Sequence, residues 1–324
     1  MKLIIQIPCY NEEKSLPVTI GALPKEIPGV TSIEYLIIND GSQDKTVEAA
    51  RRCGVHHIVN LTKKSGLAVG FMAGLDACLQ LGADVIVNTD ADNQYCGADV
   101  ETLIRPILEG RADIVIGERP IDNTEHFSWL KKKLQRLGSW VVRLASDTDI
   151  PDAPSGFRAF TRDAAMRMNV VSEYTYTLET IIQAGRKNMA IMSVPVRTNP
   201  EMRESRLFKS MWEYIKRSVF TILRIFVMYK PLYFFTLVGL CFFGTGFLIG
   251  LRFLVLMFVY SSGGHVQSLL LAVALILIGV QTIFLGLQAD LISANRKILE
   301  DVQYRIRKIF YTNREDGHDL HADK

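Results

Sequence analysis

Two aspartates, Asp90 and Asp92, follow closely on the short apolar run Val85–Val87. A short run rich in β-branched residues is typical of a buried strand, and open α/β sheets bind ligands beyond the carboxyl ends of their strands. In an extended chain, residues i and i+2 point to the same side, so the two carboxylates can converge on one point. Two carboxylates at such a short distance repel each other unless a cation lies between them, and Mg²⁺ or Mn²⁺ suits such oxygen ligands.

This acid pair admits two interpretations. Magnesium is usually held by a few carboxylates together with substrate phosphates, which predicts a diphosphate as the second set of ligands. The alternative is a turn that carries two solvated acids, because a motif of three residues is short. The elements around the pair decide between these interpretations.

Short apolar runs alternate with helical patterns from residue 1 to about 200. This alternation predicts an α/β fold with a doubly wound, mostly parallel sheet. Three strands end in polar clusters, as expected of a site along the carboxyl edge. We expect strands at 2–7, 35–38, 57–59, 85–87, 114–116 and 190–196, and a helix at 66–81 packed closely under the sheet.

The common nucleotide-binding motifs are missing from these segments. No Gly-x-Gly-x-x-Gly follows the first strand, so a Rossmann dinucleotide site is not expected. The glycines of 66–74 come without Gly-Lys-Ser/Thr, which excludes a P-loop. Phosphates would instead be held by a metal ion and side chains.

Two uncharged apolar runs occupy 232–251 and 266–289. About twenty apolar residues span a bilayer core, so we predict a two-helix membrane hairpin. Basic residues flank the hairpin on both outer sides, whereas the connection 261–265 contains neither Lys nor Arg. This asymmetry predicts that both ends of the chain face the cytoplasm.

The bulk composition adds three expectations. A net charge of +3 is too small to indicate nucleic-acid binding by itself. The five cysteines form no Cys-x-x-Cys pair, as expected of reduced thiols in a cytosol-facing protein. We expect no signal peptide before Met1.

Four motifs occur in order along the chain: Pro8-x-Tyr10-Asn11-Glu12, Asp40-Gly41-Ser42-x-Asp44-x-Thr46, Asp90-x-Asp92-x-Gln94 and Asp152-x-x-Ser155-Gly156-Phe157-Arg158. Together they resemble the family 2 glycosyltransferases of the GT-A fold, above all the dolichol-phosphate mannose synthase and polyprenyl-phosphate glycosyltransferase branch. The resemblance implies inverting transfer of a sugar from a nucleotide-diphosphate sugar to a polyprenyl phosphate, undecaprenyl or dolichyl in type, at the cytoplasmic leaflet. The product would be a polyprenyl-monophosphate sugar, and the sugar and nucleotide stay open.

The resemblance also implies roles for individual residues. The nucleotide sugar would be bound by Pro8, Tyr10, Asn11, Glu12, Asp40 and Asp90. The metal, Mg²⁺ or Mn²⁺, would be held by Asp90, Asp92 and Gln94. Asp92 and Asp152 would be catalytic, with Asp152 orienting the sugar or stabilising developing positive charge. The alternatives are a helix N-cap for Asn11 and Glu12 and a structural turn for Asp152.

A basic segment precedes the membrane hairpin. Three arginines and a serine lie within ten residues there, which suits recognition of a phosphate at the bilayer surface. A patch held by anionic lipid is the alternative. The resemblance implies that the acceptor phosphate contacts Arg119, Arg197, Arg203, Ser205, Arg206 and either Lys133 or Arg136.

We therefore expect five regions. They are a GT-A catalytic domain at 1–206, a juxtamembrane amphipathic helix at 207–230, two transmembrane helices within 231–289 (about 232–251 and 266–288), a cytoplasmic amphipathic helix at 290–311 and a disordered tail at 312–324. The expected partners are the donor, the acceptor and the bilayer, but no nucleic acid. The resemblance is compatible with a homo-oligomer, and with a flippase and a downstream transferase that use the product.

Two other functions fit parts of the pattern. A processive polysaccharide synthase shares the fold, but it would need several more spans and usually a Gln-x-x-Arg-Trp motif. A non-catalytic membrane adaptor on a transferase fold would not need the acid pair or the basic segment.

Overall fold

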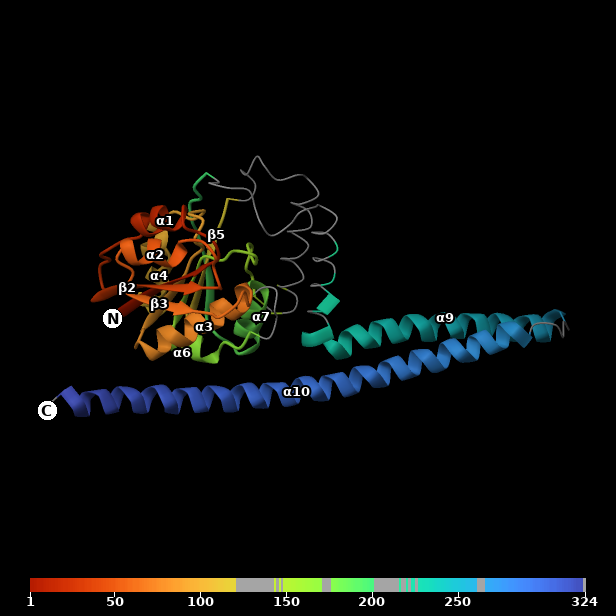
Figure 1. The fold of residues 1–324 in the computed structure, drawn as a ribbon. Coiled ribbons are helices and arrows are strands. Elements are labelled where there is room, and N and C mark those ends of the chain that lie inside the picture. The colour runs from red at the N-terminus through yellow and green to blue at the C-terminus, as the bar shows by residue number, and fades with distance from the viewer. Residues whose placement is uncertain are drawn as a thin grey trace. The chain divides into compact units, whose positions relative to one another are not determined.

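The computed structural model describes residues 1–120, 143, 146, 148–170, 176–200, 216, 220, 223–224, 227–260 and 266–322. The chain divides into two compact units (Figure 1). The first comprises Met1–Ile215 and Glu300–Lys324, and the second comprises Lys216–Leu299. The predicted residues Lys133, Arg136, Arg203, Ser205 and Arg206, and most of the predicted helix at 207–230, lie outside the described residues.

A seven-stranded sheet forms the centre of the first unit, as far as it is described, in the order β3-β2-β1-β4-β6-β5-β7. Strand β6 is antiparallel to β4 and β5, and the other pairs are parallel. The prediction of a doubly wound, mostly parallel GT-A-like sheet is thus confirmed. The strands are β1 (Lys2–Cys9), β2 (Ser32–Asn39), β3 (His57–Asn60), β4 (Val85–Asn88), β5 (Ile114–Glu118), β6 (Arg158–Thr161) and β7 (Ile191–Pro195).

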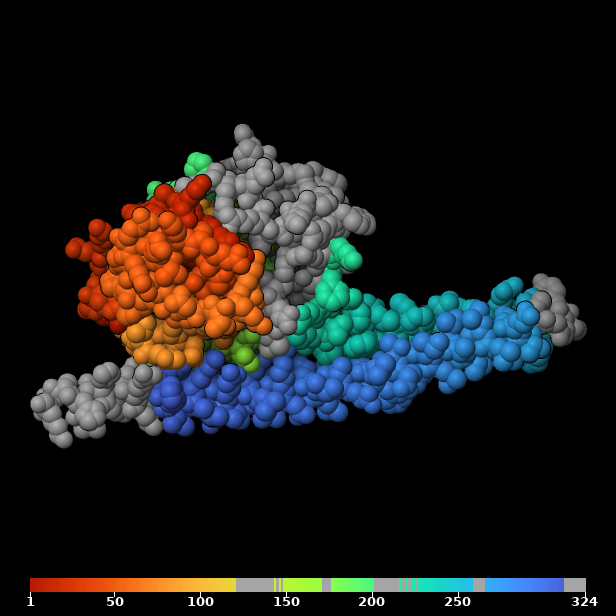
Figure 2. Space-filling model, viewed as in Figure 1, coloured from red at the N-terminus to blue at the C-terminus, as the bar shows by residue number. Residues whose placement is uncertain are grey.

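Helices pack on this sheet, and the described part of the first unit forms a dense body (Figure 2). Because helices cover both faces, β1 is buried without alternation from Leu3 to Ile7. Helix α3 lies close to the sheet, as predicted, since a Cβ at Gly74 would collide with Gln6 and Ile38. The helices are α1 (Leu16–Ala22), α2 (Thr46–Arg52), α3 (Leu67–Gln80), η1 (Gly97–Asp99), α4 (Val100–Leu108), α6 (Arg162–Arg167) and α7 (Thr177–Arg186).

Two long helices dominate the C-terminal part, α9 (Pro231–Tyr260) and α10 (Val266–Ala322). Both are long and apolar enough to cross a membrane. Within the second unit they approach at small residues: a Cβ on Gly279 would lie 2.7 Å from the Gly239 carbonyl oxygen. Helix α10 also continues unbroken where a span, an interfacial helix and an irregular tail were expected.

Candidate active site

Five polar segments gather at one edge of the sheet. Strands β1, β2 and β4 run parallel, and β5 runs in the same direction because β6, which lies between β4 and β5, is antiparallel to both. The residues that follow these four strands therefore lie at the same edge. Because β6 runs the other way, the segment before it, 152–157, reaches the same edge. The topology therefore brings all four predicted motifs to one side of the sheet.

Asp90 lies at the centre of this edge. A Cβ added to Gly156 would lie 2.9 Å from Asp90 Oδ2 and 3.1 Å from the Tyr176 hydroxyl, so this close approach requires a glycine. Burial raises the pKa of Tyr95 and of Tyr176, and the negative charge of Asp90 raises both further. The Asp90 carboxylate is thus surrounded by neutral phenols and by the backbone of the Asp152 motif.

Asp92 belongs to a tight turn that follows Asp90. Its Oδ1 accepts a hydrogen bond from the Gln94 backbone N–H at 3.2 Å, and Asn93 between them has a φ of +59°. The Asn93 side-chain oxygen is buried and has no hydrogen-bond partner within the described residues. Asp90 and Asp92 are both partly exposed, so their oxygens can reach a ligand at the edge.

The acid pair suits a divalent cation whose remaining ligands come from a bound substrate. The described residues contain no group of three or more His, Cys, Asp or Glu side chains that could hold a metal by themselves. Two partly exposed carboxylates are the donor set of a Mg²⁺ or Mn²⁺ site that is completed by phosphate oxygens. Gln94 contributes its backbone N–H to Asp92 and lies in the same turn.

Asp152 is fully buried and is held by Arg119. Arg119 Nε lies 2.8 Å from Asp152 Oδ2 and Nη2 lies 2.9 Å from Oδ1, while the Arg119 backbone N–H also donates to Oδ2 at 3.2 Å. The predicted assignment gave these residues separate roles, with Arg119 on the acceptor phosphate. In the structure they form one bidentate pair beside Tyr95 and Asp90.

Arg158 fixes the segment that carries Asp152. Its guanidinium donates to the carbonyl oxygens of Ala153, Ser155 and Thr177, each at 2.7 Å. Burial lowers the pKa of Arg158 to about 10. These bonds join the 152–156 segment to the first turn of α7.

The loops after β1 and β2 form a second part of the edge. The Lys64 ammonium lies 3.8 Å from the centroid of the Tyr10 ring, which is a cation–π contact. Asp40 accepts hydrogen bonds from the backbone N–H groups of Ser65 (2.6 Å) and Gly66 (3.0 Å) at the start of α3. Asp40 therefore positions the loop that brings Lys64 to Tyr10.

Asn11 and Glu12 tie these two loops together. Asn11 Oδ1 accepts from the Gln43 N–H at 2.8 Å, and the Asn11 N–H donates to the Ser42 hydroxyl at 3.0 Å. The Glu12 carboxylate accepts from the Ser15 hydroxyl at 2.5 Å, just before α1. Both side chains thus support the loops, whereas Pro8 and Tyr10 remain partly exposed at the edge.

Arg197 is paired with Asp99 rather than standing alone. Arg197 Nη2 lies 2.6 Å from Asp99 Oδ1, although the arginine side chain is 70% exposed. Two residues on, Asn199 donates from its side chain to the carbonyl oxygens of Asn93 (2.9 Å) and Tyr95 (3.2 Å). The segment after β7 therefore holds the turn that carries Asp92.

Several supporting residues of the site were not predicted, among them Asn88, Tyr95 and Asn199. Asn88 is buried directly before the acid pair, and its side chain donates to the Gly156 carbonyl (2.9 Å) and the Tyr176 hydroxyl (2.8 Å). The Tyr95 hydroxyl accepts from the Gly156 N–H at 3.0 Å. The sequence feature that could have identified Asn88 is a polar residue at the end of a buried strand.

Comparison with known proteins agrees with this geometry. The family model described as "Glycosyl transferase family 2" matches residues 4–168. The undecaprenyl-phosphate mannosyltransferase of Micrococcus luteus is 28% identical over 219 residues, which cover 64% of this chain and 88% of that protein. The glycosyltransferase AglJ of Haloferax volcanii is 27% identical over 310 residues, which cover 92% of this chain and 96% of that protein.

A solved structure shows the same fold. The crystal structure of glucosyl-3-phosphoglycerate synthase from Mycobacterium tuberculosis, in complex with Mn²⁺, UDP-glucose and phosphoglyceric acid, is similar with a TM-score of 0.55. The match covers 70% of this chain and 78% of that chain, at 15% sequence identity. At that identity the likeness establishes the GT-A-like architecture alone.

Proposed function

The chain belongs to glycosyltransferase family 2, and we propose that it transfers a sugar from a nucleotide-diphosphate sugar to a polyprenyl phosphate. The relatives named for undecaprenyl-phosphate mannosyl transfer and polyprenol monophosphomannose synthesis support this acceptor class. Two apolar helices long enough to cross a membrane agree with a lipid acceptor. The donor sugar is the part of the reaction that the residues leave open.

The observation that carries the proposal is the Asp90–Asp92 turn at the carboxyl edge, packed against the Asp152 segment. Asp90 and Asp92, with Gln94 in the same turn, are the residues that would hold Mg²⁺ or Mn²⁺. Such an ion neutralises charge on the leaving diphosphate when it is bound. The nucleoside lies toward Pro8, Tyr10 and the Asp40 loop in this proposal.

The bond changes follow from the acceptor's chemistry. A phosphate monoester has a second pKa near 6, so its oxygen is already an anion at neutral pH and needs no strong base. That oxygen forms a new bond to the anomeric carbon from the face opposite the nucleotide. The bond from that carbon to the diphosphate oxygen breaks, the nucleoside diphosphate leaves with the electron pair, and the anomeric centre inverts.

The Arg119–Asp152 pair suits this mechanism. A carboxylate whose two oxygens are both held by a guanidinium is poorly placed to accept a proton, and no proton needs to be removed here. We therefore propose that Asp152 does not act as a base. It orients the sugar or stabilises the positive character that develops at the anomeric carbon, and Arg119 positions it.

The acceptor phosphate is assigned to basic residues near the edge. Arg197 lies at the end of β7, and its exposed guanidinium keeps donors beyond those used by Asp99. The other predicted members of this group are Arg119, Arg203, Ser205, Arg206 and either Lys133 or Arg136. We further propose that both termini face the cytoplasm, and that the protein works as an oligomer that passes its product to a flippase and a downstream transferase.

The test is transfer by the full-length protein in nanodiscs with undecaprenyl phosphate and Mg²⁺ or Mn²⁺. Radiolabelled UDP-glucose, UDP-galactose, UDP-N-acetylglucosamine and GDP-mannose are supplied one at a time, and label in the organic extract is counted. One donor is expected to give a glycolipid that mild acid cleaves to one sugar per phosphate. Long polymeric product would indicate a processive synthase, and no product from any donor would favour a non-catalytic adaptor.

A further inference from the structure

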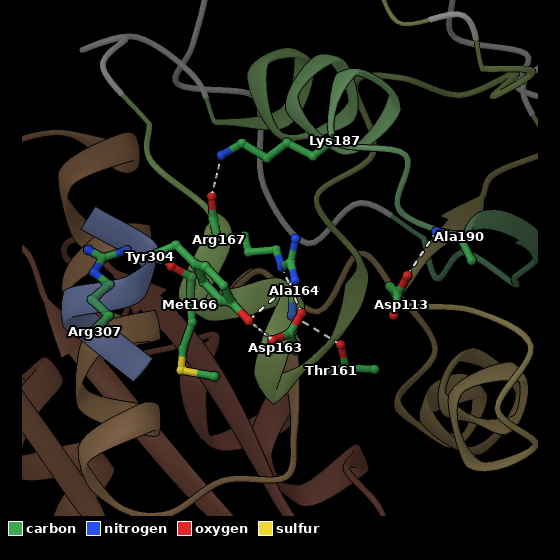
Figure 3. A network of polar contacts seen from close by, with 10 residues as sticks. All are labelled: Asp113, Thr161, Asp163, Ala164, Met166, Arg167, Lys187, Ala190, Tyr304 and Arg307. Atoms are coloured by element: carbon green, nitrogen blue, oxygen red, sulfur yellow. Dashed lines mark hydrogen bonds and ion pairs between the residues drawn. The ribbon is translucent and has the colours of Figure 1, made fainter. Parts of the chain in front are cut away.

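The segment Glu300–Tyr311 of α10 belongs to the same compact unit as the sheet, although it continues the helix that contains the second apolar run of the chain. One face of this segment contacts α6 and α7, and Figure 3 shows the central part of that contact. The opposite face, with Ile306, Ile309 and Phe310, is more than half exposed. The helix thus has a docked face and an exposed face.

Tyr304 is the centre of the docked face. Its hydroxyl donates to Asp163 Oδ1 at 2.5 Å, and Arg167 Nε donates to the other oxygen of Asp163 at 2.7 Å. The Arg167 guanidinium also lies over the Tyr304 ring at 4.2 Å and donates to its hydroxyl at 3.2 Å (Figure 3). Each of these three side chains therefore contacts the other two, and Tyr304 links the first and last turns of α6.

Cations cap the carboxyl end of α6. Arg307 Nη1 donates to the Met168 carbonyl at 2.8 Å and lies 3.4 Å from the Met166 carbonyl. Lys187, at the end of α7, donates to the Arg167 carbonyl at 2.7 Å and pairs with Glu300 at 3.1 Å. The last carbonyl groups of a helix have no partner within it, so these contacts stabilise a helix too short to form alone.

Farther along the same face, the Tyr311 hydroxyl donates to Asp76 of α3. Tyr311 is 4% exposed and Glu300 is 9% exposed. In the space-filling view, the atoms of this segment lie directly against the orange atoms of the first unit (Figure 2). The docked face is therefore anchored at both of its ends as well as at Tyr304.

Helix α6 is directly connected to the Asp152 motif. Strand β6 ends at Thr161, whose side chain caps α6 by accepting from the Ala164 N–H at 3.1 Å. The same strand begins at Arg158, which fixes the 152–156 segment and the start of α7. The motif is thus linked to α7 through Arg158 and to α6 through β6, and α10 contacts α6 and the end of α7.

We infer that Glu300–Tyr311 is a positioning strap for the catalytic site, with Tyr304 and Arg307 as its positioning residues. The strap holds α6 and the end of α7, and through β6 and Arg158 it fixes the segment that carries Asp152. The rate of the reaction then depends on a segment of α10 that follows the second apolar run in the chain. Only the activity measurement below rests on the proposed function.

The test compares two matched variants of the full-length protein in nanodiscs, Arg307→Met and Arg305→Met. Arg305 lies two residues from Arg307, but its side chain is 73% exposed and pairs with Asp301 in the same helix. Hydrogen exchange of 152–167 and the steady-state constants are measured for both. For Arg307→Met we expect faster exchange in 152–167 and a kcat at least about fivefold lower, with the KM for the nucleotide sugar within about twofold.

Arg305→Met should match the wild type in both measurements. Arg307→Lys keeps a charged donor and should recover more than half of the lost kcat, which a general loss of folding would not allow. Tyr304→Phe, which keeps the ring, tests the strap if Arg307→Met does not fold, and it should also speed exchange in 152–167.

Equal exchange in Arg307→Met and Arg305→Met would overturn the inference, whatever the activities. Faster exchange with an unchanged kcat would overturn it too, since the strap would then have no effect on the reaction. A wild-type protein without transferase activity would count against the proposed function, while the exchange comparison would still decide whether the strap holds α6 and the motif.

Discussion

Arg119 and Asp152 form a bidentate ion pair in which Nε lies 2.8 Å from Oδ2 and Nη2 lies 2.9 Å from Oδ1. Asp152 is fully buried, and the Arg119 side chain is 16% exposed. Arg119 comes from the end of β5, and Asp152 comes from the segment before β6. The pair therefore joins two predicted site residues across neighbouring strands.

Removing one partner of this pair should lower the free energy of unfolding more than removing both. Arg119→Met removes the guanidinium that holds both oxygens of the buried Asp152 carboxylate, which should lower the free energy of unfolding by about 3 kcal/mol and abolish transfer. The double variant Arg119→Met/Asp152→Asn should regain much of that stability but no activity. Thermal unfolding in detergent micelles and transfer assays measure both effects. Equal stability of the two variants would contradict the pairing.

Gly156 should not tolerate even one methyl group. The added Cβ of Gly156→Ala would lie 2.9 Å from Asp90 Oδ2, so the Asp90 carboxylate or the motif segment must shift. We expect a loss of about 1–3 kcal/mol in stability and a higher metal concentration for half-maximal activity. Gly21→Ala is the control, since its Cβ would meet nothing within 4 Å and should slightly stabilise α1. Unchanged metal dependence in Gly156→Ala would count against Asp90 as a ligand.

The Asp99–Arg197 pair should make stability depend on pH in the acid range. Burial works against the charged form of Asp99, but hydrogen bonds from Arg197 outweigh it and lower the pKa of Asp99. A lowered pKa in the folded state adds stability above the ordinary aspartate pKa of about 3.9, and this stability is lost as pH falls through the folded value. The stability gap between wild type and Asp99→Asn should therefore shrink from about pH 5 to pH 2.

This pH dependence is measured as the thermal midpoint at each pH. Asp301→Asn serves as the control, because its pair with Arg305 is exposed and contributes little. A gap that stayed constant with pH would exclude the Asp99 charge as its source.

The contact between α9 and α10 in the second unit should depend on Gly279. A Cβ there would lie 2.6 Å from the Phe243 backbone nitrogen, so Gly279→Leu must separate the two helices. We expect the thermal midpoint in micelles to fall by about 5 °C. Gly244→Leu on α9 is the matched control, because its Cβ would meet nothing within 4 Å. Equal midpoints for the two variants would argue against this packing.

The sequence predicted the parts of the fold that depend on local patterns. Strands β1, β2 and β4 correspond to apolar runs that are long or rich in β-branched residues. Because helices cover both faces of the sheet, side chains on both faces of these strands are apolar, and the run is uninterrupted. Strand β6 was missed because its four residues, Arg158–Thr161, have polar ends and no apolar run. Its antiparallel position depends on pairing with β4 and β5, which no local pattern specifies.

The candidate site likewise contains residues that the sequence could predict and partners that it could not. The acid pair could be found from residue types and spacing, and the Asp152 motif from its resemblance to a known family. The partners could not: the pairing of Arg119 with Asp152, 33 residues away in sequence, has no local signal. The expected contact of Arg119 with the acceptor phosphate stays a prediction. The apolar spacing around Tyr304 predicted an amphipathic helix but not its docked face, because Asp163 is 141 residues distant.

The most direct test of the account is the effect of Asp92→Asn on metal-dependent transfer. Glycolipid formation and nucleotide-sugar binding are measured for the full-length protein across a titration of Mn²⁺, with and without EDTA. Asp84→Asn is the control, since Asp84 precedes the same strand at its other end and accepts from the Lys2 N–H.

We predict that EDTA stops transfer by the wild type, and that Asp92→Asn lowers transfer by at least about 100-fold and removes the metal dependence of binding. Transfer and nucleotide affinity that survive both Asp92→Asn and EDTA unchanged would contradict the account.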